Sequence, residues 1–136
     1  MSVPSSENIA RAVCSDHWDG ERYASSLFKG ENTSVSRLAI TPLEDSWDLF
    51  RKRVENPPTR TLMQIGEINV GKMQRIAKEH DNNTNLTVEP KPLPGYDSHA
   101  EIPQKITRGL ANKIIKELVK HNPPSQEVVL FHRPRN

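Results

Sequence analysis

The chain has 136 residues, of which 34% are hydrophobic, 26% are charged and 11 are proline, so it is long enough for one domain with a modest core. Nineteen Lys and Arg nearly balance seventeen Asp and Glu, and a net charge of +2 is too small to indicate nucleic-acid binding. A single cysteine excludes an internal disulfide, and neither a signal-peptide core nor a membrane-spanning run is present. We therefore expect a cytoplasmic protein outside the membrane.

The first part of the chain has few signs of regular structure. Residues 1–34 are rich in Ser, Asn, Asp and Glu, which favours a loosely structured segment. We expect residues 1–15 to be mobile, residues 16–132 to form a single domain and residues 133–136 to be a basic tail.

The rest of the chain alternates strand and helix patterns. Alternating or apolar runs predict strands, and apolar residues at helical spacing predict helices. Proline pairs or turn residues end most of these segments. The expected strands are 34–41, 61–65, 86–90 and 127–131, and the expected helices are 42–55, 70–79 and 104–121. This pattern predicts one compact α+β domain, with a small mixed sheet and about three helices.

The helix predicted at 104–121 has a basic side. Lys105, Arg108 and Lys116 fall opposite its apolar stripe. Such a face is either an ordinary solvated surface or a surface that contacts an anionic ligand, and the second interpretation gains if Arg133 and Arg135 of the basic tail lie alongside. Ser36, in the strand at 34–41, is a further candidate ligand-binding residue. Phosphate binding needs several cations that act together.

Motifs of known chemistry are absent from the sequence. No phosphate loop, dinucleotide-binding glycine pattern, nucleophile turn or HExxH helix occurs. Cys14 and His17 lie close in sequence, but no second ligand pair follows. We therefore expect no metal and no cofactor, and we expect Cys14 to be an inert thiol.

The segment "GYDSHAEIPQKI" at 95–106 carries the most suggestive residues. His99 and Glu101 lie two apart in a predicted strand, so their side chains share one face. A carboxylate beside a histidine suits acid–base chemistry near neutral pH. Arg37, in the strand at 34–41, is the expected partner that would hold a phosphate or carboxylate. The alternative is that His99 and Glu101 form a surface pair, or that Glu101 caps the following helix.

Three short segments resemble a group of small uncharacterised bacterial proteins. That group has an SSAF-like, an SVSR-like and a HAEI-like stretch in this order, which correspond here to residues 25–28, 34–37 and 99–102. The resemblance implies that the three segments belong to one site, and that the setting is the bacterial cytoplasm. It implies no activity.

Two functions remain open at this point. The first is a small binding or accessory protein that recognises a partner protein or an anionic ligand. The second is a small enzyme acting on nucleotide or RNA phosphates, with His99 as acid and base, Glu101 orienting it and Arg37 holding the phosphate.

Overall fold

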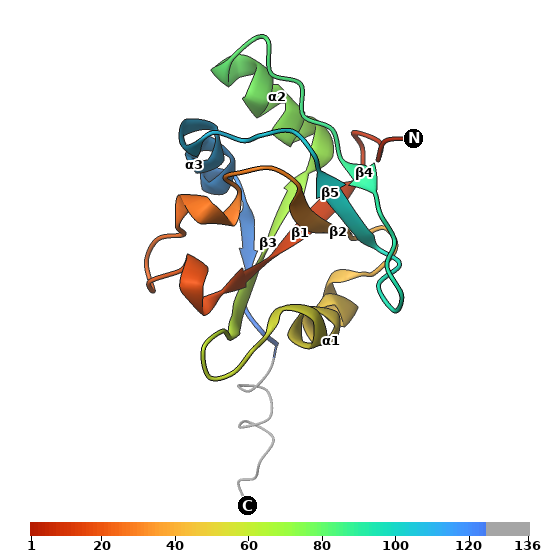
Figure 1. Ribbon diagram of the computed structural model, residues 1–136, viewed down its shortest axis with the longest axis vertical. Helices are drawn as coiled ribbons and strands as arrows, with labels where there is room; N and C mark the ends of the chain where they lie inside the picture. The colour runs from red at the N-terminus through yellow and green to blue at the C-terminus, as the bar shows by residue number, and fades with distance from the viewer. Residues whose placement is uncertain (125–136) are drawn as a thin grey trace, which may run out of the picture.

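The computed structural model describes residues 1–124, in which three helices pack against a six-stranded sheet (Figure 1). The strand order is β4-β5-β2-β1-β3-β6, and each described pairing is antiparallel. The predicted α+β fold is confirmed, with an antiparallel sheet in place of the mixed one. The elements are β1 (Asn8–Cys14), the 3-10 turns η1 (Ser15–His17) and η2 (Ser25–Leu27), β2 (Thr33–Arg37), α1 (Leu43–Val54), β3 (Leu62–Asn69), α2 (Val70–His80), β4 (Glu89–Pro90), β5 (His99–Ile102), α3 (Arg108–Lys116) and β6 (Val119–His121).

Strand β1 lies inside the sheet, between β2 and β3. This corrects the expectation that the N-terminal residues are loosely structured. The segment "IARAVC" does not alternate apolar and polar residues, because both faces of β1 are covered and its alanines and cysteine are buried along with Ile9 and Val13. A strand buried on both faces lacks the period-2 pattern on which the prediction relied.

The sheet has two covered faces. Helix α1 packs on one, here called the α1 face, where Trp47 and Phe50 contact Ala10 and Ala12 of β1. Helices α2 and α3 and the turn η2 cover the other, here called the α2–α3 face. The larger core lies on this second face and includes Ile9, Val13, Leu27, Phe28, Val35, Met73, Ile102, Leu110 and Ile114. None of the described helices is long and apolar enough to cross a bilayer.

The predicted helices 42–55 and 70–79 are confirmed as α1 and α2, but the third is shorter than predicted. Thr107 caps α3, accepting a hydrogen bond from the Leu110 N–H, and the helix ends before Leu118. Leu118 packs on Gly66 of β3, and the next three residues form β6 beside β3. Pairing of residues 119–121 with β3 therefore ends the helix, although the helical pattern of apolar residues in the sequence continues to residue 119. The predicted strand 127–131 and the basic tail 133–136 lie outside the described residues.

The strands β1 and β2 separate part-way along their length. Their described pairing consists of Ile9 with Arg37 and Ala10 with Ser36, whereas β1 pairs with β3 from Asn8 to Cys14. Continuing the β1–β2 register would place Arg11 opposite Val35, but no pairing is present there. The sheet is therefore open at this point, and the opening positions the site described next.

Candidate functional site

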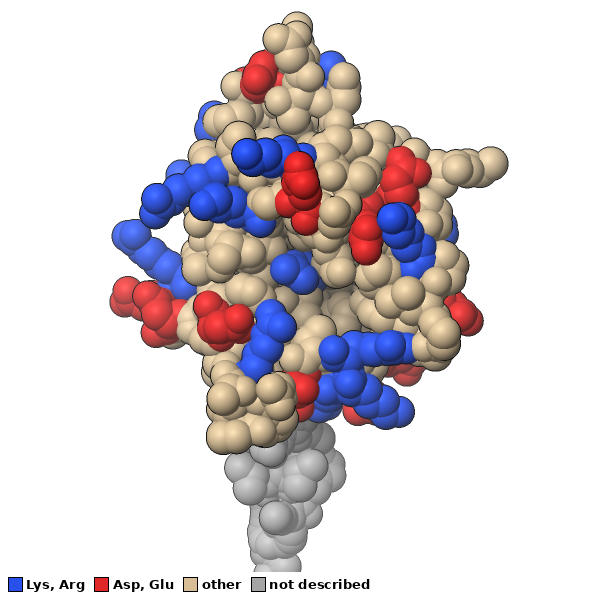
Figure 2. All heavy atoms as spheres, in the orientation of Figure 1, with Lys and Arg blue, Asp and Glu red and all other residues tan. Residues whose placement is uncertain are grey.

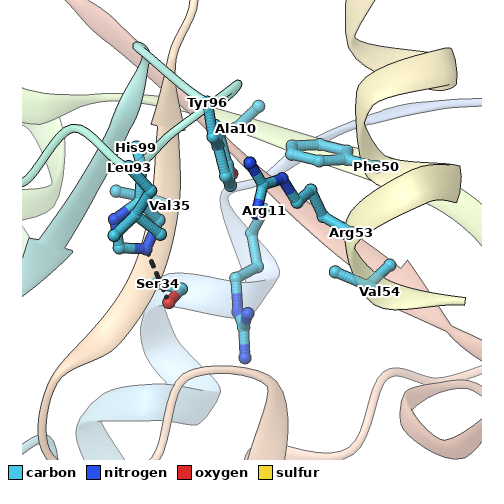
Figure 3. Close-up of a pocket in the computed structure, with 11 residues that line it drawn as sticks. Ala10, Arg11, Ser34, Val35, Phe50, Arg53, Val54, Leu93, Tyr96 and His99 are labelled. Carbon is cyan, nitrogen blue, oxygen red and sulfur yellow. Dashed lines mark hydrogen bonds between the residues drawn. The ribbon is translucent and has the colours of Figure 1, made fainter.

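A cavity of about 220 Å³ lies where β1 and β2 separate. Residues of both strands form its walls, and α1 and the loop before β5 close it from the side (Figure 3). Figure 2 shows Lys and Arg atoms around a hollow near the middle of the molecule. The polar residues that line the cavity are Arg11, Ser34, Arg53, Tyr96 and His99, and among the described residues the lining contains no Asp or Glu.

Arg11 is the cation at the inner part of the cavity. Its Nε donates a hydrogen bond of 2.8 Å to the carbonyl oxygen of Leu27, in turn η2. Within residues 1–124, no carboxylate forms an ion pair with Arg11. Burial, followed by repulsion from Arg60, lowers the pKa of Arg11 from its ordinary value, although an arginine in a protein stays protonated. The site therefore holds a partly buried positive charge that no carboxylate of the described residues pairs.

Arg53 and Tyr96 form the opposite part of the cavity. Arg53 extends from α1, its guanidinium lies 5.3 Å from the centre of the Tyr96 ring, and it donates a hydrogen bond to the carbonyl oxygen of Pro94. Burial raises the pKa of the Tyr96 phenol, and a hydrogen bond with Ser36 and the nearby arginines partly offset this. The phenol therefore stays neutral and can donate a hydrogen bond to an anion.

His99 is held by a hydrogen bond at each ring nitrogen. Its Nδ1 lies 2.8 Å from the carbonyl oxygen of Lys91, and its Nε2 lies 3.1 Å from the hydroxyl of Ser34 (Figure 3). The ring also packs edge-on against Tyr96, with the ring centres 5.0 Å apart. These contacts fix the imidazole, which is only 6% exposed.

The structure does not bring Arg37 to His99. Ser36 is the cross-strand partner of His99, so these two share the α1 face and Arg37 points to the opposite face. Glu7 binds the Arg37 guanidinium through two hydrogen bonds, of 3.0 and 2.7 Å. The expected meeting of Arg37 and His99 is therefore wrong, because the alternation along β2 separates them.

Glu101 shares a face with His99, as predicted, but has a different partner. Its carboxylate lies 3.4 Å from the Lys91 ammonium, while His99 bonds to the Lys91 carbonyl oxygen. Glu101 therefore does not take the expected role of orienting the imidazole; the main-chain carbonyl oxygen of Lys91 holds the ring instead. The alternative role of Glu101 as a helix cap is also not what is found, since Thr107 caps α3.

The four predicted ligand-binding residues lie outside the cavity lining. The hydroxyl of Ser36 is fully buried and lies 2.8 Å from that of Ser98. Arg108 and Lys116 are exposed at the two ends of α3, and Lys105 is exposed in the segment before the helix. The structure therefore leaves this basic face as a surface separate from the cavity.

Cys14, Asp16 and His17 form a second cluster, with possible ligand atoms within 4.8 Å of one another. The Cys14 N–H donates to His17 Nδ1 at 3.3 Å, and Arg60 bonds to Asp16 at 3.2 Å. Burial raises the pKa of the Cys14 thiol and lowers the pKa of His17. A cation would have to displace Arg60, and the buried thiol resists deprotonation.

Sequence reasoning missed most residues of the cavity. Arg11 was assigned to a loosely structured segment, and Tyr96 and Arg53 had no pattern that linked them. Arg11 did carry one signal, since it is a lone charge inside the apolar run "IARAVC". A charge within a buried strand is costly and therefore suggests a function.

Comparison with known proteins adds no assignment: no family model matches the chain, and no curated protein or solved structure gives a significant match. The proposals below therefore depend on the geometry of the site.

Proposed function

We propose that this protein is a small binding domain that recognises an anionic group in the cavity between β1 and β2. Arg11 carries the proposal, because it lines the cavity and forms no ion pair within residues 1–124. Partly buried charges in proteins are normally paired or hydrogen-bonded. A phosphate or carboxylate would supply the missing counter-charge.

The remaining polar groups of the cavity support the same ligand class. Arg53 adds a second positive charge, and Tyr96 adds a neutral hydroxyl. Guanidinium groups match the oxygen geometry of phosphate and carboxylate better than other cations do. The cavity, at about 220 Å³, is smaller than the ~300–1,000 Å³ of most pockets for whole small molecules. We infer that one terminal anionic group enters and that the rest of its carrier stays outside.

The carrier is a partner protein or a small molecule such as a nucleotide. The cytoplasm is the proposed location, supported by the buried free thiol of Cys14, and the three short segments shared with the bacterial group support a bacterial setting. Two of these segments, 34–37 and 99–102, contribute Ser34 and His99 to the cavity wall, and η2, in the third, accepts the bond from Arg11.

The binding proposal is tested by calorimetric titration with inorganic phosphate, and with acetate as the carboxylate probe. Arg11→Met should weaken phosphate binding at least about tenfold, because a hydrogen bond to a charged group contributes roughly 1.5–3 kcal/mol. Arg37→Met is the matched control, since Glu7 holds that arginine away from the cavity. Equal binding by wild type and Arg11→Met would contradict the proposal, as would no binding of either probe.

Charge reversal at Lys105, Arg108 and Lys116 tests whether phosphate binds in the cavity or on the basic face of α3. The triple variant should bind phosphate in the cavity as wild type does. A loss of phosphate binding that depends on salt concentration would show that the anion binds at α3 instead.

A second candidate is an enzyme acting on nucleotide or RNA phosphates, with His99 as acid and base. The observation that favours it is the pair of hydrogen bonds at the His99 ring. In this enzyme, two residues differ from those expected from the sequence. The Lys91 carbonyl oxygen, in place of Glu101, would orient the His99 ring, and Arg11, in place of Arg37, would hold the phosphate.

A further inference from the structure

The hydrogen bonds of His99 assign its tautomer. The carbonyl oxygen of Lys91 can only accept, so the His99 Nδ1 at 2.8 Å must carry a proton. In the neutral ring Nε2 then has a free lone pair. The Ser34 hydroxyl, 3.1 Å away, must therefore donate its proton to Nε2. A hydroxyl that donates to an oriented imidazole is the arrangement of an activated nucleophile.

Ser34 differs from the neighbouring hydroxyl groups in both partner and location. Ser36 and Ser98 bond to each other at 2.8 Å, and Thr41 donates to Ser98 at 2.9 Å. The Tyr96 phenol also bonds to Ser36, and the hydrogen bonds described for this chain of hydroxyl groups do not reach a base. Ser34 lines the cavity, with Arg11 among the other lining residues. In the view of Figure 3, the Ser34 hydroxyl and the Arg11 guanidinium both lie away from Tyr96.

We propose that Ser34 is a nucleophile that His99 activates for transfer of a phosphoryl group from a small phosphate monoester. This proposal rests on the proposed function, since Arg11 must hold the phosphate first. Its guanidinium would neutralise part of the charge that the phosphoryl group carries in the transition state. The size of the cavity favours a terminal phosphate over a phosphate inside a chain.

The reaction has two balanced steps. The Oγ of Ser34 forms a bond to phosphorus while the bond from phosphorus to the alcohol oxygen breaks. The hydroxyl proton passes to Nε2 of His99 and then to the departing alcohol. Water next attacks the phosphoserine with His99 as base, which releases inorganic phosphate and restores the Ser34 hydroxyl.

The test uses p-nitrophenyl phosphate as the substrate. Release of p-nitrophenol is followed by absorbance, and acid-quenched protein is analysed by mass spectrometry for phosphate on Ser34. Wild type should release p-nitrophenol and carry phosphoserine at position 34. Ser34→Ala should lose both signals. His99→Asn, which keeps a donor for the Lys91 carbonyl oxygen, should slow release about 100-fold or more. Ser46→Ala is the matched control and should behave as wild type, because Ser46 bonds to main-chain carbonyl oxygens and lies outside the cavity lining.

The outcomes separate the two proposals. If inorganic phosphate binds but wild type acquires no phosphate on Ser34, the nucleophile is ruled out and the binding domain stands. If Ser34→Ala releases p-nitrophenol as fast as wild type, Ser34 is likewise excluded. If neither phosphate nor acetate binds, the proposed function itself fails; if only acetate binds, the nucleophile is ruled out and the binding domain stands. Thermal melts identify any variant that has lost its fold, and Ser34→Cys then provides a second, less disruptive substitution whose product would be a phosphocysteine.

Discussion

Glu7 holds Arg37 on the sheet face opposite to His99, through two hydrogen bonds of 3.0 and 2.7 Å. Both side chains are partly buried, at 20% and 16% exposure, and the hydrogen bond that Arg37 donates to Glu7 raises the pKa of Arg37. The pair joins the segment before β1 to β2, next to the point where these strands separate. Arg37 therefore stabilises the edge of the opening.

Removing Arg37 should lower stability without changing ligand binding. Arg37→Met should reduce the free energy of unfolding by about 1–3 kcal/mol, because it leaves the Glu7 carboxylate without its partner. Urea denaturation measures this loss. In a double-mutant cycle with Glu7→Gln, the loss of unfolding free energy in the double variant should be smaller than the sum of the two single losses. Additive losses would show that the pair contributes little.

Arg53 should matter for binding more than its neighbour Arg51 does. Arg53 lines the cavity, whereas Arg51 pairs with Asp48 and lies over Trp47. We expect Arg53→Met to weaken phosphate binding about threefold, a modest loss because this side chain is exposed. Calorimetric titration of both variants checks this. An equal or larger effect of Arg51→Met would contradict the assigned cavity.

Tyr23 should make the protein sensitive to alkali. Burial raises the pKa of its phenol from 10.0 to about 12, so the folded state keeps the proton longer than the unfolded chain. The stability from this group is complete below the unfolded value and is lost as pH rises through the folded value. Denaturation at several pH values between 9 and about 12 measures the effect. In Tyr23→Phe, the free energy of unfolding should depend less steeply on pH in this range. If the slope equals that of wild type, Tyr23 is not the cause of the pH dependence.

Gly66 should be needed where β3 meets Leu118. A Cβ added at Gly66 would lie 3.0 Å from a Leu118 methyl carbon. Gly66→Val should destabilise the protein by about 1–3 kcal/mol through overpacking. Pairing with Leu118→Ala should recover part of the loss, since that change removes the methyl groups that clash. Full stability of Gly66→Val in a urea melt would show that Leu118 moves freely.

Local signals in the sequence were sufficient for several elements. Trp47 and Phe50 recur at helical spacing, and proline pairs or caps bound the segment, so α1 and α2 could be predicted within one residue of their ends. The shared face of His99 and Glu101 followed from the alternation of a strand. These features depend on near neighbours in the chain, and their physical causes are local.

Tertiary structure alone decided the strand order and the site. A fully buried β1 has no alternating pattern, so Arg11 could not be recognised as a residue of the sheet interior. The opening between β1 and β2 results from where pairing stops, after Ala10 and Ser36, and no local rule specifies that. The sequence by itself determined which residue types could hold an anion. Packing of distant segments placed Arg11 rather than Arg37 in the cavity wall, because the alternation of β2 directs Arg37 to Glu7 while the strands separate beside Arg11.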